Sequence, residues 1–211
     1  MHAPVRALAA SALMTTLVLA GCSATAEPEA SVSPTAAPTS SSAPSASADS
    51  RDTTNFNQED VMFAMNMIAH HQQAIEMSDM LLAKSDVDER VAELAERIRA
   101  AQQPEIEHMN EMLDNWGIEM SDDASGTHHD MGGSDGGMMS EEDMGALEAA
   151  PGPEASRLFV EQMIMHHEGA VEMAEAEVEA GENADAVEMA ERIISDQSNE
   201  IAEMEALLTE L

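Results

Sequence analysis

The sequence is poor in cysteine and in aromatic residues. Its 211 residues include one Cys, one Trp, three Phe and no Tyr. A single Cys cannot form an internal disulfide or a thiolate zinc site, so any metal site must use His, Met or carboxylate ligands. Aromatic residues make up 2% of the chain, and strand-forming residues are scarce enough to exclude an all-β fold.

Positive charge is also scarce. Eight Lys and Arg stand against 42 Asp and Glu, which gives a formal charge of -34. Such a surface repels phosphate, so the charge excludes nucleic acid as a partner. A salt-adapted protein has the same balance, so acidity by itself does not indicate metal binding. Methionine, in contrast, is abundant at 19 residues, and its thioether sulfur suits soft metal ions.

Residues 1–21 have the pattern of an export signal. Arg6 precedes an apolar run over residues 7–20, which is too short to predict a membrane-spanning helix. The sequence Leu-Ala-Gly-Cys that ends at Cys22 resembles a bacterial lipobox, which implies cleavage before Cys22 and lipidation of its thiol. We therefore expect a protein anchored to the outer face of the cytoplasmic membrane, or a periplasmic one. The alternative is an ordinary signal peptide with an incidental Cys.

A tether and one domain follow the signal. Residues 22–52 consist almost entirely of Ser, Ala, Thr and Pro after the Cys, a composition that predicts a disordered tether. Within the domain, residues 53–211, MIAHHQQAIEM from Met67 recurs as MIMHHEGAVEM from Met163. AERIRAAQQPEIEHM from Ala95 recurs, one residue out of step, as AERIISDQSNEIAEM from Ala190. The domain therefore consists of two copies of one repeated unit.

Each repeat reads as two helices joined by a short turn. Repeat 1 spans residues 56–116 and turns near residues 85–86, where Ser85 with Asp88 suggests an N-cap; repeat 2 spans residues 153–211 and turns near Gly181, which suggests a C-cap. Residues 117–152 between them hold a His- and Met-rich linker and a short capped helix. The sequence predicts an all-α four-helix bundle built from two tandem hairpins.

Helical periodicity places paired histidines on the core-facing side of the first helix of each repeat. The apolar stripes that contain these histidines run from Phe63 to Leu81 and from Phe159 to Met173. The stripes on the partner helices, from Leu94 to Leu113 and from Met189 to Leu208, are each interrupted by a Gln with a Glu three residues later. A structural interpretation is a satisfied polar core layer, in which Gln and Glu hydrogen-bond the imidazoles. A functional interpretation is a metal site in which the same groups orient the ligands. The candidate ligands are His70, His71, His166 and His167 with Met67, Met77, Met163 and Met173, and the orienting groups are Gln102, Glu105, Gln197 and Glu200.

The linker is a second candidate site. It contains His128, His129 and Met131, and then Met138-Met139, in a Gly/Ser/Asp context that offers thioethers no core to fill. Thioether with imidazole suits Cu(I), so we expect either loose copper capture here or an ordinary disordered linker.

The segments that begin at Asp60 (DVMFAMNMIAHHQQAIEM) and Arg157 (RLFVEQMIMHHEGAVEMA), with the intervening GGMMSEEDMGALEAA, resemble the domain of unknown function 305 family over residues 56–211. The resemblance implies a ferritin-like bundle, export or lipid anchoring, and copper binding through the paired histidines with their methionines. Ser156 departs from the family, which often carries an acid there, equivalent to Asp60; if that acid supports the site, the second site is weakened.

Three functions compete. The first is a lipid-anchored protein that binds or scavenges copper, Cu(I) or Cu(II), without turnover, and a wide inward sector also permits a homodimer. The second is a structural or interaction bundle whose His and Gln layer only sets the register of the helices. The third is a di-iron oxidase, which needs two Glu-x-x-His motifs; Glu105 to His108 supplies one, and its equivalent from Glu200 ends in Glu203. We expect no enzyme.

Overall fold

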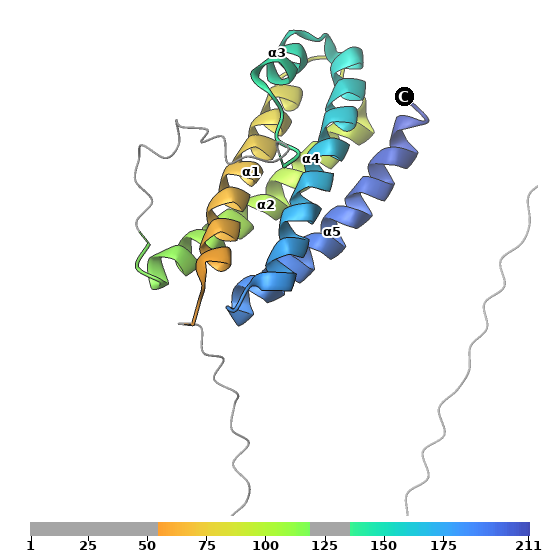
Figure 1. Ribbon diagram of the computed structural model, residues 1–211. Coiled ribbons are helices and arrows are strands. Elements are labelled where there is room, and N and C mark those ends of the chain that lie inside the picture. The colour runs from red at the N-terminus through yellow and green to blue at the C-terminus, as the bar shows by residue number, and fades with distance from the viewer. Residues whose placement is uncertain (1–54, 119–135) are drawn as a thin grey trace, which may run out of the picture. The chain divides into compact units, whose positions relative to one another are not determined.

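The computed structural model describes residues 55–118 and 136–211. All regular structure in these two ranges is helical, and no helix there combines the length and the apolar character needed to cross a membrane. The helices are α1 (Gln58–Leu82), α2 (Glu89–Asn115), α3 (Glu141–Ala149), α4 (Gly152–Ala180) and α5 (Ala184–Leu208). The long helices form the hairpins α1–α2 and α4–α5, which pack together mainly through α1 and α4 (Figure 1). The prediction of an all-α bundle of two hairpins is confirmed.

Polar side chains fix where the helices begin. Asn57 and Ser140 form capping boxes with Asp60 and Asp143, while Asp88 and Asn183 cap α2 and α5. Each cap accepts backbone N–H groups that have no partner inside the helix, which stabilises a helix by about 1 kcal/mol. The predicted C-cap at Gly181 and the short capped helix before Pro151 are both present. In the turn between α1 and α2, the N-cap of α2 is Asp88 and not Ser85, which lies in the loop before it.

The apolar core consists of two clusters with a polar layer between them. One cluster, around Phe63, Met109 and Met189, lies on one side of the paired histidines, and the other, around Leu94 and Phe159, lies on the other side. The predicted stripes are buried, except that Met173, Ile201 and Leu208 are half-buried. The layer is therefore enclosed by hydrophobic packing above and below, which excludes bulk water from it.

Asp60 and Ser156, at equivalent positions of the two repeats, have equivalent structural roles. Asp60 Oδ1 accepts the backbone N–H groups of Glu182 (3.1 Å) and Asn183 (2.9 Å) before α5. Ser156 Oγ accepts the N–H of Asp88 (2.9 Å) before α2. Both residues lie about 15 Å along their helices from the paired histidines at a rise of about 1.5 Å per residue. The exchange of acid for Ser therefore changes how a loop is held, at a distance from the histidine layer.

Glu177 is a buried carboxyl group next to Asp60. Burial, then the interaction with Asp60, then the charge of Glu59 raise the pKa of Glu177 from 4.5 to about 8. The folded chain thus keeps a proton that the unfolded chain releases above pH 4.5. The contribution of Glu177 to stability is fully present below pH 4.5 and is lost as the pH rises to about 8, because the unfolded state then binds fewer protons than the folded state.

We predict that Glu177→Gln removes this pH dependence, because an amide keeps the hydrogen-bond donor and has no charge to desolvate. The free energy of unfolding at pH 8 should exceed that of the wild type by on the order of a few kcal/mol, with little difference at pH 4.5. Urea denaturation followed by circular dichroism at both pH values measures this difference. Exposed Glu179→Gln is the matched control. Equal gains at both pH values would show that Glu177 does not carry the proton.

Candidate metal centre

The paired histidines of α1 and α4 meet at the centre of the bundle. The rings of His70 and His166 face each other with their centroids 3.7 Å apart and their planes tilted by 38°. All four histidines, His70, His71, His166 and His167, are at most 1% exposed. Because α1 and α4 form the main contact between the hairpins, the internal repeat brings one His pair from each half to a single place (Figure 1).

The second histidine of each pair, His71 or His167, is hydrogen-bonded to a carboxylate on its partner helix. His71 Nε2 donates to Glu105 Oε2 at 2.8 Å, and His167 Nε2 donates to Glu200 Oε2 at 2.7 Å. The two carboxylates are about one quarter exposed, while the imidazoles are fully enclosed. A hydrogen bond of this kind fixes the tautomer and the orientation of an imidazole, as carboxylates commonly do for histidines that bind metals.

The two glutamines lie in the same layer, and their side-chain amides make no hydrogen bond to any described residue. Gln102 and Gln197 are 3% and 4% exposed, and neither amide oxygen nor amide nitrogen has a hydrogen-bond partner in the described part of the chain. They do not supply the imidazole partners that the structural interpretation requires of them. Only Glu105 and Glu200 do so, and each binds one ring nitrogen.

Several imidazole nitrogens in the layer are likewise free. Within residues 55–118 and 136–211, Nδ1 has no hydrogen bond in His70, His71 and His167. In His166, neither ring nitrogen has one. Native proteins bond nearly all of their buried polar atoms, so a cluster of exceptions needs an explanation such as a ligand. Here the exceptions gather where two His pairs and two Gln residues converge.

His70 and His166, the two histidines whose rings face each other, are neutral at physiological pH. Burial lowers the pKa of His70 to about 3, with a smaller contribution from the nearby imidazole of His71. The pKa of His166 is also well below 6.5, first because of burial and then because of His70 and His167. A neutral imidazole keeps a lone pair on one nitrogen, which is the form that binds a metal ion.

The candidate methionines lie on both sides of the layer. Met67, Met77 and Met163 are fully buried, and Met173 is half-buried. Among the described residues no three His, Cys, Asp or Glu side chains are arranged to hold a metal ion together. Imidazole nitrogen with thioether sulfur is a donor set that favours Cu(I) over hard ions.

The end of the linker contacts the layer directly. His70 Nε2 donates to the carbonyl of Gly136 at 2.9 Å. Met139 is 8% exposed and packs into the core cluster around Leu94 and Phe159, so the expectation that it has no core to fill is wrong. Sequence reasoning did not find Gly136. The only indication of it in the sequence is that the two repeats differ three residues after His70 and His166, at Gln73 and Gly169.

Other predicted residues lie elsewhere. His128, His129, Met131 and Cys22 fall outside the described residues. His108 is exposed and lines a surface pocket with Glu111 and Asp185, so the Glu-x-x-His segment does not direct its His into the core.

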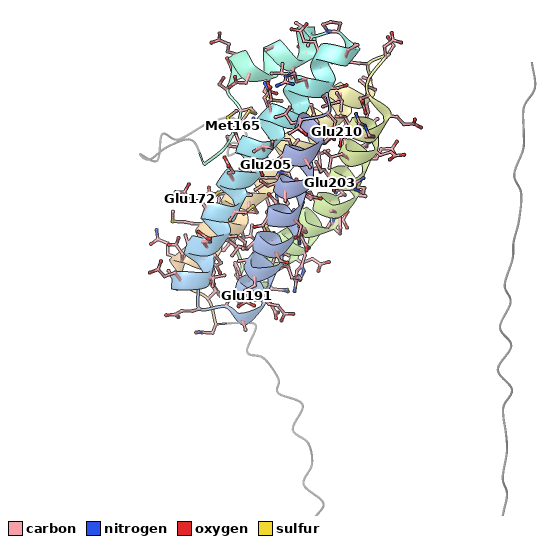
Figure 2. The ribbon with its side chains drawn as sticks, turned by 90° about the vertical axis from the view of Figure 1, so that its right-hand side faces the viewer. Met165, Glu172, Glu191, Glu203, Glu205 and Glu210 are labelled. Carbon is pink, nitrogen blue, oxygen red and sulfur yellow. The ribbon has the colours of Figure 1, made fainter. Side chains whose placement is uncertain are left out.

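Exposed acidic side chains cover the outer faces of α4 and α5. Glu172, Glu191, Glu203 and Glu205 point away from the bundle in Figure 2. Negative charge therefore covers these outer faces, in addition to the carboxylates of Glu105 and Glu200 that contact the histidine layer.

Comparisons with known proteins agree with this architecture. The family model "Domain of unknown function (DUF305)" matches residues 60–208. A DUF305 fragment from Deinococcus radiodurans is 32% identical, with 74% of this chain and 98% of that chain covered and a TM-score of 0.64. A DUF305 protein from Streptomyces coelicolor is 34% identical, with 72% and 93% covered and a TM-score of 0.64.

A third similar structure is that of a copper-bound protein. CopM in the Cu(II)-bound form is 30% identical, with 72% of this chain and 96% of that chain covered and a TM-score of 0.60. CopM also has Cu(I)-bound and Ag-bound forms at 28% identity. No curated protein matches this sequence.

The unbonded glutamines generate a prediction about the metal-free protein. Replacing both Gln102 and Gln197 with Leu should raise the free energy of unfolding by about 1–3 kcal/mol, because each amide is buried without a compensating hydrogen bond. Chemical denaturation in the presence of a chelator measures the change. Exposed Gln103→Leu is the control on the same helix. Destabilisation by the double replacement would show that the two amides are paired.

Proposed function

The chain belongs to the DUF305 family, and we propose that it is an exported, lipid-anchored protein that binds copper at the histidine layer of its bundle. The observation that carries the proposal is the enclosed cluster of four imidazoles, two of which, His70 and His166, are held neutral by burial. Several of their nitrogens have no partner among the described residues, and buried thioethers lie on both sides. Imidazole and thioether together suit Cu(I), and imidazole also binds Cu(II). The copper- and silver-bound forms of CopM support the same chemistry for a protein of this family.

The role proposed is sequestration without turnover. The site is enclosed by two apolar clusters, so a bound ion is shielded from water and from small reductants and oxidants. Glu105 and Glu200 would orient His71 and His167, while Met67 and Met163 would supply sulfur one helical turn before the histidines. His128, His129 and Met131 of the linker would capture ions outside the bundle.

The alternative is a bundle that binds no metal and uses the layer only to set its helix register. In that case the polar atoms of the layer should be paired with one another, as far as the geometry allows. Within the described part of the chain, the amides of Gln102 and Gln197 and the ring nitrogens of His166 have no partner, which favours the metal-binding role.

The proposal is tested by titrating Cu(I) into the chain that begins at residue 23, under anaerobic reducing conditions, against a chromophoric chelator. We expect competition with the chelator that is lost when His70, His71, His166 and His167 are all changed to Ala. The control His108→Ala, on the surface, should bind as the wild type does.

A second variant changes His128, His129 and Met131 to Ala, and it separates the two candidate sites. Loss of tight binding only in this variant would move the site to the linker. A wild-type chain that does not compete at all would contradict copper binding.

The anchor is tested separately at Cys22. The full precursor should partition with membranes and incorporate a labelled fatty acid, and Cys22→Ser should do neither. Detergent phase separation and metabolic labelling measure the two outcomes. Equal partitioning of the precursor and the variant would show that Cys22 is an incidental residue of an ordinary signal peptide.

A further inference from the structure

The segment that follows the linker, residues 136–139, crosses the junction of α1 and α4 at the level of the histidine layer. Figure 1 shows it descending from α3 along these two helices; we call it the strap. On the α1 side, Gln73 makes two hydrogen bonds to Met139: its Nε2 donates to the carbonyl oxygen at 2.9 Å, and its Oε1 accepts the N–H at 2.7 Å. The side chain of Gln73 thus holds the strap by its backbone.

On the α4 side the strap lies directly against the helix backbone. A Cβ atom at Gly137 would lie 2.6 Å from the carbonyl oxygen of Met165, and Gly137 has a φ of 78°. A Cβ at Gly169 would lie 1.9 Å from the carbonyl oxygen of Gly136. Only glycine at both positions allows this approach.

Gln73 and Gly169 occupy equivalent positions of the internal repeat, three residues after His70 and His166. The repeat therefore differs where the strap is seated: one half supplies an amide that holds it, and the other half lacks a side chain so that it fits. A single strap docked on a two-fold arrangement makes the two histidine pairs inequivalent, because its Gly136 carbonyl bonds to His70 alone.

The bond from the strap repeats a pattern seen at two other histidines of the layer. His71 and His167 donate from Nε2 to Glu105 and Glu200, and His70 donates from the same atom to Gly136. In all three, Nδ1 has no partner among the residues that the structure describes. A neutral imidazole with its hydrogen on Nε2 carries its lone pair on Nδ1.

We infer that the strap is a positioning element of the histidine layer: the Gly136 carbonyl holds His70 as the Nε2–H tautomer, and Gln73, Gly137 and Gly169 seat the strap so that it does so. The free Nδ1 of His70 is then the atom available to a soft metal ion. This last step rests on the proposed function, while the tautomer of His70 does not.

The experiment uses the chain from residue 23 and displaces the strap from each side. Gly137→Val places a branched side chain against Met165 and Gly169. Its control is Gly117→Val, because Gly117 has a similar φ of 72° and nothing within 4 Å of a Cβ. Gly169→Ala displaces the strap from α4 without loss of helix propensity, and its control is Gly145→Ala in α3, where a Cβ meets open space.

Three quantities are measured: amide hydrogen exchange at Met138 and Met139, the imidazole ¹⁵N shifts of metal-free protein, and the Cu(I) affinity in competition with a chelator. We expect Gly137→Val and Gly169→Ala to speed exchange at the strap. They should convert His70 from a single Nε2–H form to a mixture of tautomers and weaken Cu(I) binding about tenfold or more. The two controls should match the wild type in all three quantities.

Two results would overturn the inference. One is faster exchange at the strap with the His70 tautomer unchanged. The other is strap amides that stay protected in both variants, since the strap would then be held by other contacts. If the wild-type chain binds no Cu(I), the proposed function fails, and the ¹⁵N shifts still decide whether the strap sets the tautomer of His70.

Discussion

The rest of the structure depends on burying a polar layer in the middle of an apolar core. Four imidazoles and two amides are removed from water, and a buried polar group without a partner costs about 1–3 kcal/mol. Apolar clusters on both sides of the layer, together with the capped helix ends, offset this cost. The polar layer therefore destabilises the metal-free fold, and a metal ion that binds there only in the folded state would raise the free energy of unfolding.

The internal repeat explains how the layer forms. Each hairpin alone presents one histidine pair on an open face, and the layer closes only when α1 packs against α4. The turns within the two hairpins follow the same symmetry, since Asp60 of α1 holds the start of α5 and Ser156 of α4 holds the start of α2. The symmetry is broken at the strap, where Gln73 and Gly169 differ.

The sequence predicts most of the fold because its signals are periodic and local. The stripes around Phe63 and Phe159 place the histidines in the core, and a Glu three residues after each Gln indicates the carboxylate partners of His71 and His167. It could not place the strap, because its bonds to His70 and Gln73 join residues 66 positions apart with no periodic pattern. For the same reason the sequence pattern assigns Met139 to the linker, although α1, α3 and α4 create a core position for it.

The most direct test of the central claim is a crystal structure of the chain from residue 23 after soaking with Ag(I), with silver located by its anomalous scattering. The account predicts silver within the layer, bonded to imidazole nitrogen of His70 or His166 and to thioether sulfur of Met67 or Met163. Silver only on the acidic surface, with the layer unchanged, would contradict it.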